Sequence, residues 1–237
     1  MIRDPLDAQD PGESRGPAMT LYSYFRSSAA YRVRIALELK GLPYACIPVH
    51  LVRDGGQQLA PGYRALNPEA LVPTFIEPDG GALTQSLAIV EYLEEIQPEP
   101  PLLPRRPVDR AYVRSIAMQI ACDVHPIDNL RVLSYLKKTL GVSDEQKNAW
   151  YRHWVDLGFA ALEAHLIQET RPGGRVGRFC FGDTPTLADL CLIPQVFNAK
   201  RMSIPLDPYP TIERIANAAA DIEAFVRAAP GNQIDAE

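Results

Sequence analysis

A proline-rich stretch near the middle of the chain divides it into two parts with different residue patterns. The stretch QPEPPLLPRRP holds five prolines between Pro98 and Pro107. Proline lacks a backbone N–H and favours extended chain, so neither a regular helix nor a central strand is expected to run through it. We therefore interpret residues 101–107 as a linker between one folded domain at residues 19–100 and a second at residues 108–237.

The part before the linker alternates between strand-like and helix-like segments. Thr20–Tyr24 alternates polar and apolar residues as a strand does, and the following segment up to Gly41 has helical spacing. YACIPV indicates a second strand, and LVPTFIEPDGGALTQS indicates two short strands joined by a turn. A helix with Ser86 as its N-cap follows. This order predicts a small α/β domain.

Almost every segment after the linker has the three-four apolar spacing of a helix. In GDTPTLAD, Thr186 and Asp189 have the spacing of a capping box, with Asp in place of the usual Glu. We therefore expect an all-helical second domain. Its predicted helices are residues 108–122, 130–140, 144–169, 187–198 and 211–219.

Composition and charge exclude several classes of protein. The net charge of −5 gives no electrostatic basis for binding nucleic acid or an acidic membrane, and no apolar run approaches the ~18 residues of a membrane span. The four cysteines form no CxxC, which is typical of reduced thiols in the cytoplasm, and the histidines share no metal-ligand spacing. Residues 1–18 are polar and rich in Pro, Gly and acidic residues, so we interpret them as a disordered extension.

Two adjacent hydroxyls stand at the start of the first predicted helix, in FRSSAAYRVRIALELKG. One interpretation of Ser27 and Ser28 is a plain N-cap, which spacing alone favours. The other is an anion site, because a helix N-terminus carries partial positive charge. If the anion is a thiolate, a serine hydroxyl and the helix end both lower the thiol pKa from its free value of about 8.5. One hydroxyl can then cap the helix while the other donates to the anion.

Three further positions have both a structural and a functional interpretation. Val72-Pro73 is either a strand-start proline or a cis bond that exposes the Val72 backbone to a bound peptide. Gln85-Ser86 is either a plain helix cap or a helix start that binds a carboxylate. His125, which precedes a proline, is more typical of a structural residue than of a catalyst.

Together these motifs resemble those of zeta-class glutathione transferases. The resemblance runs from Met19 to about Pro230 and implies a thioredoxin-like N-terminal domain, a helical C-terminal domain, glutathione bound between them, and a homodimer. The segments that carry it are YSYFRSSAAYRVRIALELKGLPY, DGGQQ, LNPEALVPTF, LTQSLAIVEYLEE, CDVHPIDNLRVLSYL and FCFGDTPTLADLCLIPQVFNAKR.

The resemblance also implies roles for individual residues. Ser27 matches the serine that stabilises the glutathione thiolate, which leaves Ser28, beside it at the same helix start, the better placed to cap. Arg26 and Arg201 match positions that grip substrate carboxylates. Ala29 stands where many zeta-class proteins have cysteine, which removes a second thiol from the site. The other positions that match the glutathione site are Gln58, the Val72 backbone, Gln85, Ser86, His125, Asn129, Leu130 and Arg131.

The activity implied by the resemblance is glutathione-dependent cis–trans isomerisation of a small dicarboxylic enone such as maleylacetoacetate, in the breakdown of tyrosine and phenylalanine. Two other activities stay open: isomerisation of maleylpyruvate, and conjugation of glutathione to halogenated acids. A non-catalytic interaction module is the alternative from another class. It has no need of a glutathione site, so the presence of Ser27, Gln85 and Ser86 is evidence against it.

Overall fold

The computed structural model describes residues 19–237, and the predicted disordered extension at residues 1–18 lies outside them. The chain forms two compact units. The first contains the described residues up to Pro100 together with Glu223–Glu237, and the second contains Pro101–Ile222.

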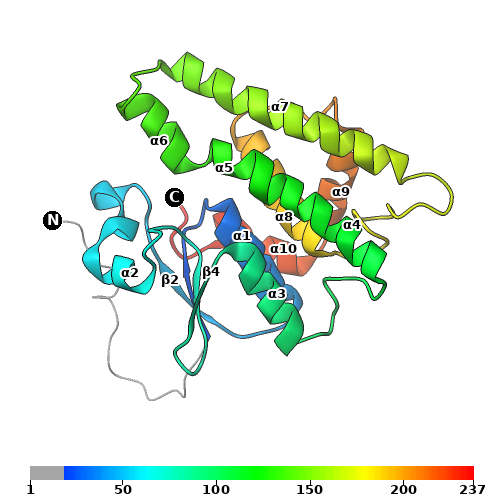
Figure 1. Ribbon diagram of the computed structural model, residues 1–237, viewed down its shortest axis with the longest axis horizontal. Coiled ribbons are helices and arrows are strands. Elements are labelled where there is room, and N and C mark those ends of the chain that lie inside the picture. The colour runs from blue at the N-terminus through cyan, green and yellow to red at the C-terminus, as the bar shows by residue number, and fades with distance from the viewer. Residues whose placement is uncertain (1–18) are drawn as a thin grey trace. The chain divides into compact units, whose positions relative to one another are not determined.

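A mixed four-stranded sheet organises the first unit (Figure 1). Its strand order is β2-β1-β3-β4, in which β1 pairs parallel with β2 and antiparallel with β3, and β3 pairs antiparallel with β4. This is the thioredoxin-like sheet that the sequence predicts. The strands are β1 (Thr20–Ser23), β2 (Ala45–Pro48), β3 (Thr74–Ile76) and β4 (Ala82–Thr84).

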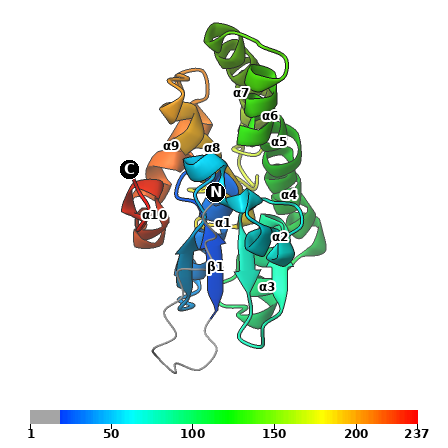
Figure 2. The same ribbon diagram turned by 90° about the vertical axis from the view of Figure 1, so that its left-hand side faces the viewer.

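Helix α1 is the central helix of this unit. It connects the parallel strands β1 and β2, because a parallel pair needs a crossover, and it packs against α3 and α10 (Figure 2). Val33, Ala36 and Leu37 are fully buried on its three-four spacing. The helices are α1 (Ser28–Leu39), α2 (Pro61–Leu66), α3 (Ser86–Ile96) and α10 (Glu223–Ala228), with short 3₁₀ turns η2 (Arg53–Gly55), η3 (Gln57–Leu59) and η5 (Pro230–Asn232).

An aromatic cluster supports the turn between β1 and α1. The rings of Tyr24 and Phe25 meet edge to face with centroids 4.9 Å apart. Because Val72 packs in the same cluster, the chain before β3 lies beside the turn that leads into α1. The buried members of the cluster are Tyr22, Tyr24, Phe25, Val49, Tyr63 and Val72.

The second unit is helical, as the sequence predicts. The first long helix of this unit ends at Met118, four residues before the predicted end, because a π-helical segment replaces its last turn. The elements are α4 (Pro107–Met118), η4 (Gln119–Val124), α5 (His125–Asp128), α6 (Leu130–Lys138), α7 (Asp144–Gln168), α8 (Leu187–Arg201) and α9 (Pro210–Ala220).

The predicted capping box at the start of α8 is confirmed. The carboxylate of Asp189 accepts hydrogen bonds from the backbone N–H of Thr186 at 2.8 Å and from its hydroxyl at 3.0 Å. It also accepts one from the backbone N–H of Cys180 at 2.9 Å. Burial raises the pKa of this carboxyl, and the hydrogen bonds oppose that shift.

The C-terminal segment differs from the prediction. We expected the helical domain to run through residues 108–237, whereas Glu223–Glu237 belongs to the first unit. The physical reason is a set of hydrogen bonds to α1. The hydroxyl of Tyr31 donates to the Phe225 carbonyl at 3.2 Å, and Nε of the fully buried Arg34 donates to the Ala228 carbonyl at 3.0 Å.

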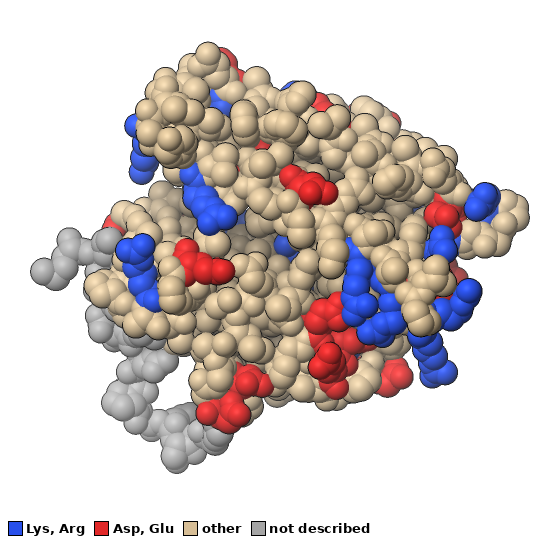
Figure 3. Space-filling view, viewed as in Figure 1, with Lys and Arg blue, Asp and Glu red and all other residues tan. Residues whose placement is uncertain are grey.

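The surface in view in Figure 3 carries acidic and basic side chains close together. Among residues 19–237, none of the helices is both long and apolar enough to cross a membrane. Over the same residues, His, Cys, Asp and Glu side chains form no group of three or more suited to a metal ion.

Candidate functional site

The two serines at the start of α1 have roles that differ from those predicted. Ser27 is the N-cap, with extended φ and ψ of −69° and 115°, and its Oγ accepts a hydrogen bond from the Ala30 N–H at 3.2 Å. Ser28 is the first helical residue and is buried, and its Oγ has no partner among residues 19–237. The expectation that Ser28 caps the helix is therefore wrong, because the cap depends on the extended backbone that only Ser27 has.

Capping does not occupy the whole Ser27 hydroxyl. A serine oxygen accepts the Ala30 N–H and still has its own O–H to donate. Ser27 is half-buried, so that proton lies at the edge of the solvent beside the free N–H groups of the first helical turn. Capping by Ser27 therefore leaves a hydrogen-bond donor available at the helix start.

A buried arginine that sequence reasoning missed shapes the turn before Ser27. Arg34 donates from Nη2 to the Phe25 carbonyl at 3.0 Å and from Nη1 to the Ser23 hydroxyl at 2.9 Å. The same Nη1 lies 3.4 Å from the Tyr24 carbonyl. Burial lowers the pKa of Arg34, and nearby groups oppose that shift only in part. These bonds fix the backbone from which Ser27 projects.

The start of α3 also differs from the prediction, because Gln85 and not Ser86 is the N-cap. Gln85 has a φ of 69°, which is unfavourable for a residue other than glycine, and its side chain makes no capping hydrogen bond. Instead its Nε2 donates to the Glu69 carboxylate at 2.9 and 3.1 Å. The first turn of α3 therefore begins at a strained residue and without a side-chain cap.

Ser86 connects the two helix starts. Its buried Oγ accepts a hydrogen bond from Nη1 of Arg32 at 3.2 Å. Arg32 belongs to α1 and is itself buried, so the N-terminal halves of α1 and α3 lie side by side. Sequence reasoning missed Arg32 as well, since an arginine on a helix is usually a solvated surface charge.

The segment between α2 and β3 contains a residue whose backbone groups take no part in the hydrogen bonding of the described chain. The Val72-Pro73 peptide bond is cis, which is one of the two predicted alternatives. Val72 is buried, yet within residues 19–237 its backbone N–H and carbonyl make no hydrogen bond. Neighbouring positions are fixed: the Tyr63 hydroxyl donates to the Leu71 carbonyl at 2.6 Å, and Asn67 donates to the same oxygen at 2.9 Å.

Gln58 is held by its own loop. Its Nε2 donates to the Leu51 carbonyl at 3.3 Å, and its Oε1 is buried without a partner among the described residues. The preceding Gln57 accepts the N–H of His50 at 2.8 Å through its Oε1. The loop is therefore organised around these two glutamines.

The remaining predicted site residues belong to the second unit. Asn129 is the N-cap of α6, and its Oδ1 accepts the Val132 N–H at 3.1 Å, which is a structural role. His125 is half-buried at the start of α5, whereas Leu130 and Arg131 are exposed on α6. Arg201 is exposed at the last residue of α8.

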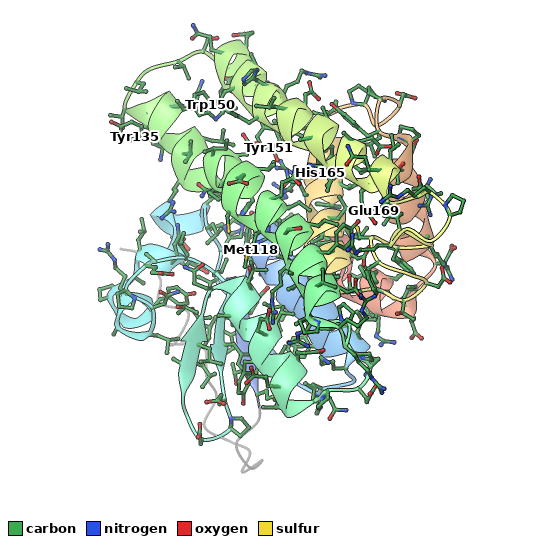
Figure 4. The ribbon with its side chains drawn as sticks, turned by 45° about the vertical axis from the view of Figure 1, so that its right-hand side comes forward. Met118, Tyr135, Trp150, Tyr151, His165 and Glu169 are labelled. Atoms are coloured by element: carbon green, nitrogen blue, oxygen red, sulfur yellow. The ribbon has the colours of Figure 1, made fainter. Side chains whose placement is uncertain are left out.

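A buried carboxyl beside these positions was also missed. Asp128 ends α5, and neither of its oxygens has a hydrogen-bond partner among the residues that the structure describes. Burial raises its pKa to about 8, so it is largely protonated at neutral pH. Tyr151, in the first half of α7 (Figure 4), lies close enough for Asp128 to contribute to raising its pKa to about 12 after the larger effect of burial.

Comparison with known proteins identifies the class to which this fold and site belong. Residues 21–101 match the sequence family described as "Glutathione S-transferase, N-terminal domain". A Vibrio cholerae protein named "Probable maleylacetoacetate isomerase" is 48% identical over 219 residues, which cover 92% of this chain and 99% of that protein. The chain therefore belongs to the glutathione S-transferase family.

Two solved structures narrow this to one class of the family. A maleylpyruvate isomerase, described as a bacterial glutathione S-transferase in the zeta class, is 45% identical with a TM-score of 0.87, over 92% of this chain and 100% of that one. The maleylacetoacetate isomerase of Methylobacterium extorquens AM1, solved with bound malonate and GSH, is 40% identical with a TM-score of 0.87, over 92% and 99% of the two chains. The predicted resemblance to the zeta class is confirmed.

Proposed function

We propose that this protein is a glutathione-dependent cis–trans isomerase that converts maleylacetoacetate to fumarylacetoacetate in tyrosine and phenylalanine catabolism. The observation that carries the proposal is the pair of neighbouring helix starts in the first unit, α1 with the Ser27 hydroxyl and α3 without a side-chain cap, joined by the bond from Arg32 to Ser86. Two adjacent N-termini suit a ligand with a thiolate and a carboxylate.

The residues of the first unit fit glutathione. The uncapped start of α3, with Gln85 and Ser86, suits the γ-glutamyl carboxylate. The unbonded backbone of Val72 suits the peptide groups of the tripeptide, and Gln58 its far end. The relative from M. extorquens was solved with GSH, which supports this assignment. From the second unit we propose contributions from His125, Asn129, Leu130 and Arg131.

The reaction requires the chain to lower the pKa of the glutathione thiol and to bind the two carboxylates of the substrate. When bound, glutathione supplies a thiolate that adds to the activated double bond, allows rotation about the resulting single bond, and leaves again by elimination. Ser27 donates its O–H to the sulfur, which lowers the thiol pKa without a general base. Ser28, whose buried Oγ has no partner among the described residues, offers a second hydroxyl at the same helix start. Arg26 and Arg201 bind the two substrate carboxylates, since a guanidinium pairs bidentately with a carboxylate.

The direct test is an assay of the purified protein with maleylacetoacetate, with and without glutathione. We expect turnover to fumarylacetoacetate only when glutathione is present, with no net consumption of glutathione. No isomerisation at saturating glutathione would reject the proposal, and steady formation of a conjugate would favour a transferase instead.

The proposed binding of the substrate carboxylates by Arg26 and Arg201 can be tested by substitution. Arg26 lies with its guanidinium carbon 4.8 Å from the centre of the Phe25 ring, and both Arg26 and Arg201 are exposed and free to meet a ligand. Arg201→Met or Arg26→Met is expected to raise the KM for the dicarboxylate about tenfold, the loss of ~1.4 kcal/mol of binding. Glutathione affinity and the circular dichroism spectrum serve as controls. Unchanged KM and kcat in a folded Arg201→Met would place the carboxylate site elsewhere.

Maleylpyruvate isomerisation is the second candidate, because a maleylpyruvate isomerase is 45% identical to this chain with a TM-score of 0.87. The two substrates share the cis-enone and differ in the group that it carries, so the same residues serve both. The ratio of kcat/KM for the two substrates decides between them.

We also propose that the protein is a cytoplasmic homodimer. The cysteines Cys46, Cys122, Cys180 and Cys191 are all free thiols, as expected in a reducing compartment. Met118 on α4 (Figure 4) and Leu157 on α7 are large apolar side chains that are about half exposed, which suits burial against a second copy. Sedimentation of the purified protein tests the dimer.

A further inference from the structure

The last residues of the chain are built into the first unit. Residues 223–237 follow the second unit in sequence, but α10 packs against α1 and is tied to it by the bonds from Tyr31 and Arg34 described above. Beyond α10, the side chain of Gln233 donates to the Arg227 and Ala229 carbonyls at 2.9 and 3.0 Å, which fixes the direction of the chain that follows. We call residues 233–237 the C-terminal tail.

Asp235 of the tail bonds to the turn that carries Ser27. Its Oδ2 accepts a hydrogen bond from the backbone N–H of Phe25 at 3.0 Å, across 210 positions of sequence. The carbonyl of the same Phe25 accepts from Arg34 at 3.0 Å. Both polar backbone atoms of Phe25 are therefore held by side chains, two residues before Ser27. The turn itself closes with the Ser27 N–H donating to the Tyr24 carbonyl at 2.9 Å.

Asp235 also contributes charge. Arg34 is fully buried, and burial lowers its pKa, while Cys46, Tyr44, Tyr31 and Asp235 raise it. Asp235 is the one carboxylate in that group, so it supplies the negative charge near the buried guanidinium.

A second acidic side chain of the tail contacts the loop that leads to Gln57 and Gln58. Glu237 pairs with Arg53, and its Oε1 lies 3.5 Å from Nε2 of His50. Nδ1 of His50 accepts the backbone N–H groups of Val52 at 3.2 Å and Arg53 at 2.8 Å. The tail therefore contacts both the turn before Ser27 and the loop before Gln57 and Gln58.

We propose that Asp235 is a positioning residue for the thiolate site: through the Phe25 backbone it fixes the turn that presents the Ser27 hydroxyl. The part that concerns the thiolate rests on the proposed function. Asp235 touches neither glutathione nor substrate in this scheme and acts through Phe25. Asp235→Ala leaves the Phe25 N–H without its acceptor, so the turn loosens and the Ser27 hydroxyl loses its alignment with the sulfur.

A conservative variant separates the loss of the hydrogen-bond acceptor from the loss of the charge. Asp235→Asn keeps an acceptor oxygen for the Phe25 N–H and removes only the charge, so it is expected to keep the turn in place. Glu223→Ala is the matched control, because Glu223 is an exposed carboxylate of the same C-terminal segment that pairs with Arg227 and not with the turn. If Asp235→Ala does not fold, Asp235→Glu displaces the carboxylate by one methylene, keeps its charge and is expected to give the same changes.

Two measurements test the proposal. The first is hydrogen exchange of residues 20–31 in the protein without ligand, where Asp235→Ala should accelerate exchange at Phe25 and Asp235→Asn should not. The second is the ultraviolet absorbance of the glutathione thiolate against pH in the binary complex. The thiol pKa should rise by about half a unit or more in Asp235→Ala, and kcat should fall about threefold to tenfold, as expected for one misplaced hydrogen bond.

The outcomes separate this inference from the proposed function. Unchanged exchange at Phe25 together with an unchanged thiol pKa in Asp235→Ala overturns the positioning role, as does equal damage by the Glu223→Ala control. A wild-type protein that gives no thiolate signal contradicts the proposed function instead, and the exchange measurement then decides the role of Asp235 in holding the turn.

Discussion

Helices α8 and α3 begin in opposite ways. At α8 the Asp189 carboxylate accepts three hydrogen bonds from Cys180 and Thr186, so the helix start is closed by the protein itself. At α3 the N-cap Gln85 makes no side-chain cap and has a φ of 69°. A closed start contributes to stability, whereas an open start at a strained residue keeps its N–H groups for a ligand at a cost to the fold.

The largest effect of a single substitution on stability is expected at the start of α8, which Asp189 caps. Asp189→Ala leaves the buried N–H groups of Cys180 and Thr186 without their acceptor and should lower the free energy of unfolding by about 3 kcal/mol or more. Urea denaturation measures this, with the exposed Asp144→Ala at the start of α7 as control. A loss below about 1 kcal/mol would show that the box contributes little and would break the comparison.

Asp128 contrasts with Asp189, because it is a buried carboxyl without the hydrogen-bond partners that Asp189 has. Its folded pKa of about 8 lies above the unfolded value, so the unfolded chain loses this proton first as pH rises. The wild-type free energy of unfolding should fall between pH 5 and 8 by up to ~1.4 kcal/mol per unit relative to Asp128→Asn. Urea denaturation across this range tests the difference, and parallel curves for the two proteins would contradict it.

The start of α1 is intermediate, since Ser27 caps the helix and keeps a proton to donate. Ser27→Ala should lower kcat about tenfold or more and also cost ~1 kcal/mol of stability from the lost cap. Ser28→Ala should change kcat much less. Steady-state kinetics and thermal melts of both variants measure the two effects. Wild-type kcat in Ser27→Ala at saturating glutathione would rule out its role at the sulfur.

The smallest effect on stability is expected at the start of α3, which has no side-chain cap. Gln85→Gly relieves the positive φ and should raise the free energy of unfolding by about 1 kcal/mol, while the KM for glutathione rises. Gln85→Ala is the control that loses the same side chain and keeps the strain. Equal stability of the two variants would mean that the strain at Gln85 is negligible.

The sequence was sufficient for features that depend on local patterns. The four strands, helices α1 and α3, the helical second unit and the Thr186–Asp189 box follow from periodicity and spacing. Helices α2 and α10 were not predicted, because the segment before β3 was interpreted as a loop and the last predicted helix ended at residue 219. Among the predicted site residues of the first unit, Ser86 contacts α1 through Arg32, and Val72 packs with Tyr24 and Phe25.

The features that were mispredicted or missed depend on tertiary contacts. Which serine caps α1, and that Gln85 precedes the first turn of α3, depend on backbone angles that residue types do not determine. Arg32 and Arg34 look like surface charges on a helix, yet both are buried and bonded. The helical pattern of residues 223–228 carries no information about which unit they join.

The return of the C-terminal segment to the first unit has a consequence for how the chain assembles. The second unit is one continuous stretch, whereas the first is completed by residues that are synthesised after the second. On the ribosome the first unit is therefore complete only after α10 has emerged, whereas all residues of the helical unit are available before that. Until Ala228 emerges, the buried guanidinium of Arg34 lacks its acceptor there, so the order of synthesis delays completion of the glutathione-binding unit to the last step.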